Sequence, residues 1–111
     1  MVSTIKETQQ PHYLLDDIRQ AAQRGNFRYD GRKVNTDIRN LCYTNEDVKK
    51  CISGLMSGQF QKCLHYENAV YDAYICEYQQ TEDSTIDKIY LKLRLLATGE
   101  VQVGIGSFHL A

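Results

Sequence analysis

The sequence has few of the residues that mark linkers, metal sites and exported proteins. Its 111 residues include one proline and seven glycines, too few for flexible linkers or low-complexity segments. Its four cysteines and three histidines show neither Cys-x-x-Cys nor His-x₃-His spacing, so we expect no zinc site. No apolar run is long enough to span a bilayer, and residues 1–10 lack the apolar segment of a signal peptide. We therefore expect no membrane segment, and free, mostly buried thiols in a reducing cytoplasm.

The chain also lacks a strong net charge. The formal charge at pH 7 is −1, which excludes a general polycation that binds nucleic acid through its overall field. Any contact with RNA or DNA must therefore come from a local group of cations. The length fits a single domain with one hydrophobic core. We assign this domain to residues 11–111 and expect the polar residues 1–10 to be disordered.

Strict alternation from Lys88 to Leu96 is the most informative pattern. One set of side chains is apolar and the other polar: Ile89, Leu91, Leu93 and Leu95 against Lys88, Tyr90, Lys92 and Arg94. Since successive side chains of a strand point to opposite faces, the pattern predicts a strand with an apolar and a cationic face. Two interpretations stay open. The stretch is either an ordinary half-solvated strand of an antiparallel sheet or part of a sheet face that holds an anion such as a phosphate backbone.

Helical periodicity comes first in the chain and strand periodicity follows. The expected helices run over 14–24, from a cap at Asn35 or Thr36 to Leu41, and from a Thr44 cap to Ser57. The expected strands run over 26–29, 59–66, 69–78, 88–96 and from Val101 onward. This order indicates an α+β fold with the N-terminal helices packed on one face of a mainly antiparallel sheet. The cationic side of 88–96 would lie on the other, open face.

The side on which two candidate residues lie depends on the regularity of their strands. Gly104 and Gly106 lie within the last strand, which suggests a bulge or the close approach of another group. Without a bulge, His109 shares the parity of the apolar positions in that strand. Lys62 shares parity with Phe60, which fits a lysine stem at the edge of the core as well as a functional lysine.

Several segments, taken in order, resemble a known family. They are Pro11-His12-Tyr13, Arg24-Gly25, Ile52-x-Gly54-Leu55-x₄-Phe60-x-Lys62, Tyr66, Ile89-Tyr90-Leu91-Lys92 and Ser107-Phe108-His109. Their order and spacing over residues 11–109 resemble the MqsR family of bacterial toxins. The resemblance implies a RelE- and YoeB-like α+β fold, and a metal-independent mRNA endonuclease that acts in stress responses. It also implies a cytoplasmic location and an antitoxin partner, a zinc-binding protein with a helix-turn-helix domain.

The same resemblance implies a catalytic set drawn from different strands. Lys62 and Tyr90 match two members of this set, whereas His109 stands where the family has a lysine. A glutamine of the family corresponds to Asp72, or to Tyr71 if the gap is placed differently. Because of these departures, a catalytically impaired RNA- or protein-binding module is an alternative. A ribosome-dependent nuclease is a third.

RNA cleavage without a metal or other cofactor needs a base, an acid and cations around the phosphate. We expect Tyr90 or Lys62 to be the base, with a pKa lowered from about 10 by neighbouring cations. Histidine titrates at about pH 6.5, so His109 is the expected acid. The expected substrate contacts are Lys92 and Arg94 at the phosphate, together with Asp72 and Tyr66.

Overall fold

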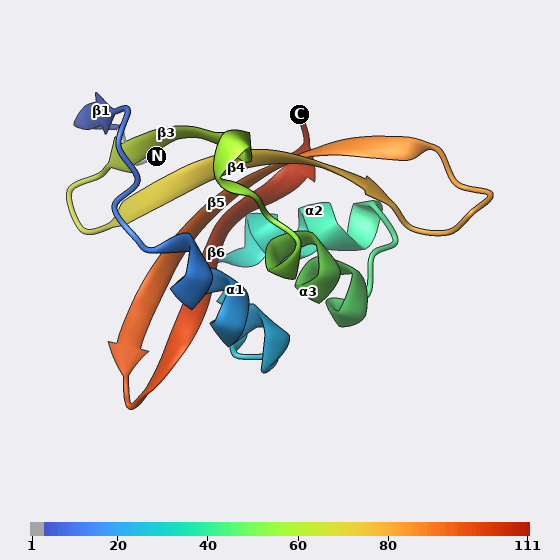
Figure 1. Ribbon diagram of the computed structural model, residues 1–111, viewed down its shortest axis with the longest axis horizontal. Helices are drawn as coiled ribbons and strands as arrows, with labels where there is room; N and C mark the ends of the chain where they lie inside the picture. Colours follow the sequence, from blue (N-terminus) through green and yellow to red (C-terminus); the bar gives the residue numbers. More distant parts are fainter. Residues whose placement is uncertain (1–3) are drawn as a thin grey trace.

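The computed structural model describes residues 4–111, apart from the side chain of Thr98. Over these residues, three α-helices pack on one face of a six-stranded, mainly antiparallel sheet. Figure 1 shows the three helices together on one side of the sheet, with the hairpin of its two longest strands extending below them. The predicted α+β architecture is therefore confirmed. We call the sheet face opposite the helices, which carries Tyr90, Lys92 and Arg94, the open face.

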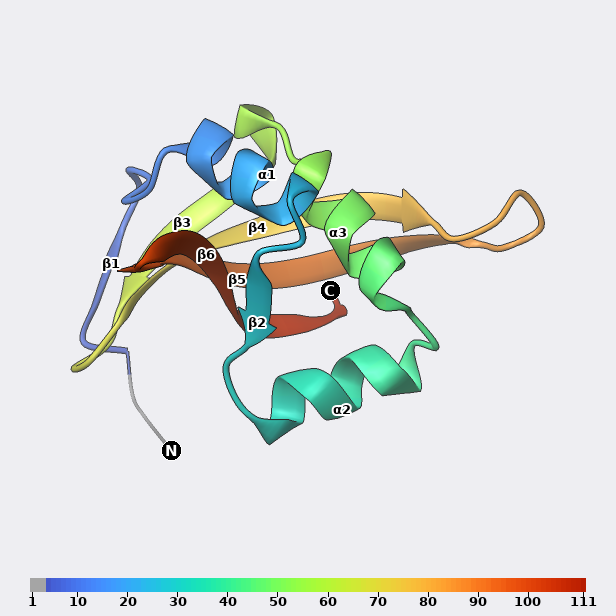
Figure 2. The same cartoon turned by 90° about the horizontal axis from the view of Figure 1, so that it is seen from below.

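The sheet has the strand order β1-β3-β4-β5-β6-β2. Its strands are β1 (Lys6–Thr8), β2 (Phe27–Tyr29), β3 (Phe60–His65), β4 (Val70–Gln79), β5 (Ile86–Thr98) and β6 (Glu100–Leu110). The helices are α1 (Leu15–Gln23), α2 (Arg32–Asn40) and α3 (Asn45–Ser53), followed by a 3₁₀ turn, η1 (Ser57–Gln59). Neighbouring strands are antiparallel except β2 and β6. Figure 2 shows β2 alongside β6, and the connection between β4 and β5 projecting away from the helices.

Capping residues account for two of the helix boundaries. After α1, Arg24 is the C-cap and Gly25 follows with a φ of 77°, as expected for a glycine just past a helix end. At the start of α3, the Thr44 hydroxyl accepts a hydrogen bond from the Asp47 N–H, and the Asp47 carboxylate accepts one from the Thr44 N–H. This reciprocal capping box confirms the predicted start of the helix.

The predicted start of α2 and the predicted end of α3 are wrong. α2 begins at Arg32 and not at a polar cap near Asn35, because Gly31 adopts a φ of 122° and turns the chain directly into the helix. α3 ends at Ser53 and not at Ser57, because Gly54 follows as its C-cap. Glycine is a poor helix former, so it stops the helix although the apolar spacing continues beyond it.

The N-terminal segment forms an edge strand that the sequence did not predict. β1 pairs antiparallel with β3, so the expectation of disorder is wrong for Lys6–Thr8. Residues 1–3 lie outside the described chain. On the open face, Glu7 Oε1 lies 3.2 Å from Lys62 Nζ. A short polar segment without periodicity takes strand conformation here because the edge of β3 offers unpaired backbone groups.

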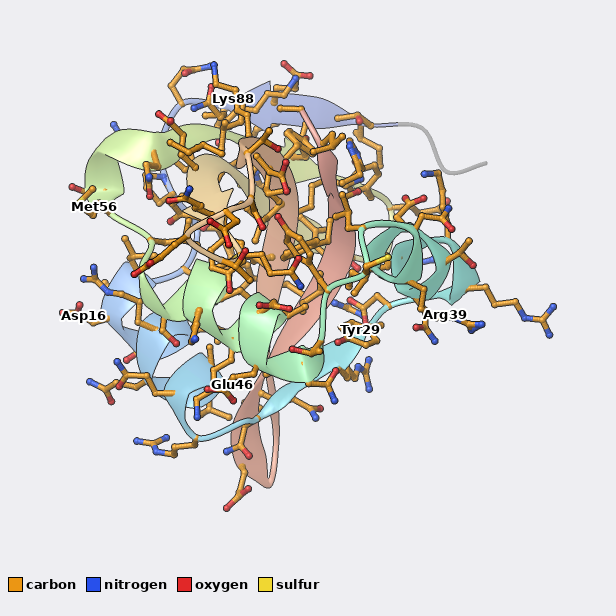
Figure 3. The ribbon with its side chains drawn as sticks, turned by 90° about the vertical axis from the view of Figure 1, so that its right-hand side faces the viewer. Asp16, Tyr29, Arg39, Glu46, Met56 and Lys88 are labelled. Carbon is orange, nitrogen blue, oxygen red and sulfur yellow. The ribbon has the colours of Figure 1, made fainter. Side chains whose placement is uncertain are left out.

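The hydrophobic core lies between the helices and the inner face of the sheet. Its largest fully buried apolar side chains are Tyr74, Phe108, Ile18, Ile52, Leu55, Ile89, Leu91, Leu93 and Ile105. Burial of each such side chain stabilises the fold by roughly 1.5–3 kcal/mol. Figure 3 shows Asp16, Arg39 and Met56 at the periphery, directed away from this core.

The cysteines of the described chain agree with the expectation of free, mostly buried thiols. All four cysteines lie in the described chain as free thiols, and three of them are buried. Among residues 4–111, no helix has the length and apolar character that crossing a bilayer requires.

Candidate functional site

The open face is built on the alternation of β5. Ile89, Leu91 and Leu93 point toward the helices and are 0% exposed. Tyr90 and Lys92 point the other way, because successive side chains of a strand alternate. The predicted division of this strand into an apolar and a cationic face is therefore confirmed.

A β-bulge in β3 brings Lys62 onto the open face. The pairing of β3 with β4 shifts between Phe60 and Lys62. Phe60 packs on the inner face against Tyr74, with ring centroids 5.7 Å apart, whereas Lys62 lies opposite Ala73. The prediction that Phe60 and Lys62 share a face is wrong, because the bulge adds one residue to the strand and reverses its parity.

A second bulge, in β6, brings His109 to the same face. The pairing of β5 with β6 shifts between Lys92 and Leu93, which leaves Gly106 as the extra residue. Beyond the bulge, His109 lies directly opposite Tyr90. The bulge suggested by the glycines of this strand is confirmed, and it separates His109 from the inward-facing positions.

The rings of Tyr90 and His109 are stacked, with centroids 5.3 Å apart and planes inclined by 28°. Nδ1 of His109 lies 2.9 Å from the carbonyl oxygen of Leu110. Because a carbonyl oxygen can only accept, Nδ1 is the donor in this hydrogen bond. Nε2 is therefore the nitrogen of His109 that can gain or lose a proton.

Burial raises the pKa of Tyr90 above its ordinary value, and electrostatic interactions with Tyr66 and Glu7 act in the same direction. The expected lowering of this pKa by neighbouring cations is therefore wrong. Lys92, two residues along the same strand, directs its ammonium to the Tyr66 hydroxyl. With its proton held more tightly, the Tyr90 phenol suits hydrogen bonding better than general-base catalysis.

Lys92 lies against two tyrosine rings. Its Nζ donates a hydrogen bond of 2.8 Å to the Tyr66 hydroxyl and lies 4.8 Å from the centroid of that ring. The same Nζ is 5.8 Å from the centroid of Tyr71. The two rings meet edge to face with centroids 5.9 Å apart. The structure thus brings together Lys92 and Tyr66, both predicted substrate contacts, and fixes the direction of the ammonium.

Arg94 is held by a carboxylate. Its Nε donates to Asp30 Oδ2 at 2.9 Å, and the Tyr71 hydroxyl donates to the same oxygen at 2.8 Å. Burial alone would raise the pKa of Asp30, but hydrogen bonds from Arg94, Tyr71 and Arg28 outweigh it and keep the pKa below its ordinary value. Asp30 is therefore ionised at neutral pH and offsets the charge of Arg94, so Lys92 is the better candidate for a phosphate contact.

Asp72 does not join this group. It lies on the inner face at 0% exposure, and its carboxylate accepts hydrogen bonds of 2.9 to 3.0 Å from the backbone N–H groups of His12 and Tyr13. The predicted contact between Asp72 and a substrate is wrong, because the carboxylate is covered and already bonded. The neighbouring Tyr71 lies on the open face, which favours the alternative placement of the gap.

The sequence did not predict that two acidic residues, Glu7 and Asp30, lie on the open face. Neither belongs to a periodic pattern, since Glu7 lies in a polar terminal segment and Asp30 in a turn. The pairing of β1 with β3 and of β2 with β6 carries them to the site. No local signal could have found them, because both pairings join segments that are far apart in the sequence.

The match to a protein-family model covers nearly the whole chain. Residues 10–109 match the MqsR toxin model, described as "Motility quorum-sensing regulator, toxin of MqsA". The chain belongs to the MqsR toxin family. No curated protein sequence matches it. In this MqsR-family chain, the residues that the resemblance implied as catalytic, Lys62, Tyr90 and His109, all lie on the open face.

Proposed function

We propose that this MqsR-family toxin is a metal-independent endoribonuclease that cuts mRNA at specific sequences and thereby stops translation. The observation that supports the proposal is the stacked pair of Tyr90 and His109 on the face that also carries the Lys92 ammonium. An imidazole, a phenol and an ammonium on one accessible face are groups that RNA cleavage without a metal can use.

The proposed reaction is an attack by the ribose 2′-oxygen on the adjacent phosphorus. The bond from phosphorus to the 5′-oxygen of the next nucleotide breaks, which gives a 2′,3′-cyclic phosphate and a free 5′-hydroxyl. Nε2 of His109 donates a proton to the leaving 5′-oxygen. Lys92 balances the additional negative charge on the phosphate. Tyr90 holds the imidazole in place through the ring stack.

In this proposal the proton of the 2′-hydroxyl goes to the Glu7 carboxylate. Burial raises the pKa of Tyr90, so its phenol stays protonated at neutral pH. The Glu7 side chain is 51% exposed and lies 3.2 Å from the Lys62 ammonium. A carboxylate oxygen can accept a proton, while the adjacent ammonium stabilises charge on the phosphate. Lys62 is thus proposed as a cation, in place of the base expected from the sequence.

Discrete cutting of a long RNA by the purified protein, in the presence of EDTA, is the first expected result. Lys62→Ala and Tyr90→Ala should each reduce the cutting rate by roughly 10²-fold. Lys50→Ala, on the exposed surface of α3, is the control and should cut normally. Unchanged cutting by both site variants would contradict the assignment. RNA binding without cutting by the wild type would favour a binding module, and cutting only in translating extracts would favour a ribosome-dependent enzyme.

Glu7→Gln tests the proposed base. The amide keeps the shape of the side chain but cannot take up the proton, so kcat should fall by about 10²–10⁴ while RNA affinity is retained. Glu82→Gln, in the exposed connection between β4 and β5, is the matched control. Gel-based cleavage assays measure kcat, and filter binding measures the affinity for RNA. An unchanged kcat, or faster cutting because Lys62 has been released, would reject Glu7 as the base.

The proposal also gives the toxin a protein partner. The family description names a toxin of MqsA, and we propose that a cognate antitoxin neutralises this chain in the cytoplasm. The resemblance implies a zinc-binding antitoxin with a helix-turn-helix domain.

A further inference from the structure

A pocket of about 430 Å³ opens on the open face next to Lys92. The residues that line it are Asp30, Tyr66, Asn68, Ala69, Tyr71, Lys92 and Gly106. The volume falls in the range of about 300–1,000 Å³ that is usual for small-ligand sites. The proposed cleavage chemistry does not use Tyr71, Asn68 or Gly106.

The two aromatic walls are held in place by their hydroxyl groups. The Tyr66 hydroxyl accepts a hydrogen bond from Lys92 at 2.8 Å, and the Tyr71 hydroxyl donates one to Asp30 at 2.8 Å. The rings stand nearly perpendicular, with an interplanar angle of 79°. Each ring therefore presents a fixed edge or face to the pocket, and little side-chain freedom remains to be lost when a ligand enters.

Gly106 makes the position of Tyr71 possible. A Cβ atom at Gly106 would lie 2.6 Å from Cε1 of Tyr71, closer than the two carbons can approach. The β6 bulge thus serves two purposes: it turns His109 to the open face, and it leaves space for the Tyr71 ring. Any side chain at position 106 would therefore displace the Tyr71 ring.

The chemistry of the lining fits a planar, polar-edged heterocycle. Tyrosine rings stack on nucleobases of any type, since every base has a π face. The Asn68 amide can both donate and accept, so it can read the edge of an unstacked base. Asp30 contributes by holding the Tyr71 hydroxyl, since its carboxylate is already bonded to Tyr71, Arg94 and Arg28. Free phosphate would interact favourably only with Lys92, whereas a nucleobase could also contact the aromatic and amide groups of the lining.

We propose that this pocket binds one nucleobase of the substrate RNA and sets the sequence preference of cleavage, with Asn68 as the discriminating side chain. The inference rests on the proposed function. Lys92 links the two sites, because it lines the pocket and is two residues from Tyr90 on the same face of β5. The base in the pocket is therefore close to the phosphate that is cut.

Mapping of the cut sites of a long RNA tests the proposal. Asn68→Ala should lower discrimination at one position of the cut sequence by about 10-fold, as expected for loss of a paired amide–base contact. Gly106→Ala should slow cutting at preferred sites by a similar factor, because Tyr71 must move into the pocket. Asn40→Ala, at the exposed end of α2, is the matched control. An unchanged preference in Asn68→Ala would overturn the proposal.

Binding of mononucleotides tests the pocket without any cleavage. Titration of the wild type with the four nucleoside 3′-monophosphates should shift the backbone NMR signals of Asn68, Ala69 and Gly106, and one base should bind best. Asn68→Ala should lose that ranking. If inorganic phosphate alone causes the same shifts, the site recognises the anion and the nucleobase proposal is wrong. If the shifts depend on the base but the protein does not cut RNA, the nucleobase pocket is supported and the proposed nuclease activity is wrong.

Discussion

RNA cleavage by the His109→Ala variant is expected to be about 10²–10⁴ times slower than cleavage by the wild type. Alanine has no proton to give to the leaving 5′-oxygen, and the stack on Tyr90 at 5.3 Å is lost. RNA affinity should change little, because Lys62 and Lys92 are untouched. Single-turnover cleavage with saturating protein, measured across a range of pH, separates the chemical step from binding.

His109→Lys provides the sharper comparison. A lysine is what the family resemblance implies at this position, and its ammonium can also donate a proton. Cleavage should therefore be faster in His109→Lys than in His109→Ala, because only the lysine can protonate the leaving 5′-oxygen.

The control for the His109 variants is His12→Ala. The His12 ring is exposed and packs edge-on against Tyr13 with centroids 4.6 Å apart, and the backbone N–H that caps Asp72 remains. This variant should cut RNA at the wild-type rate. Equal rates for the wild type and His109→Ala would exclude His109 as the general acid and would make Lys62 the next candidate for this role.

Periodicity predicted the layers of the fold because each layer has one apolar face in the core and one polar face in water. The alternation of β5 is confirmed residue by residue, since its apolar side must face the helices and its cationic side must remain hydrated. The capping box of Thr44 and Asp47 is equally local and equally reliable. β1 was missed because its polar residues carry no pattern. Only the free edge of β3 determines its structure.

The site was harder to predict because two bulges change the parity of its strands. Periodicity places Lys62 with Phe60 and His109 with the inward apolar residues, and both assignments assume regular strands. One extra residue in β3 and one in β6 reverse them. Only the second bulge had a signal in the sequence, the glycine at position 106. Asp30 and Glu7 had none, because long-range strand pairing brings them to the open face.

The largest effect on stability is expected from Asp72→Ala, with a loss of about 3 kcal/mol in the free energy of unfolding. The carboxylate is fully buried and binds the backbone N–H groups of His12 and Tyr13. Alanine would leave these donors without partners and create a cavity next to the segment that precedes α1. A decrease of this size lowers the melting temperature of a domain of this length by roughly 10 °C. Thermal and urea unfolding followed by circular dichroism measure it.

Asp72→Asn and Asp83→Ala complete the comparison. The amide in Asp72→Asn retains the volume but offers only one acceptor oxygen to the two N–H groups, so the stability of this variant should fall between those of the wild type and the alanine variant. Asp83 is exposed in the connection between β4 and β5, and its replacement should change stability by less than about 0.5 kcal/mol. Below its melting temperature, Asp72→Ala should still cut RNA, because Asp72 lies on the inner face. Normal stability combined with lost cleavage would contradict the structural role and restore Asp72 to the catalytic site.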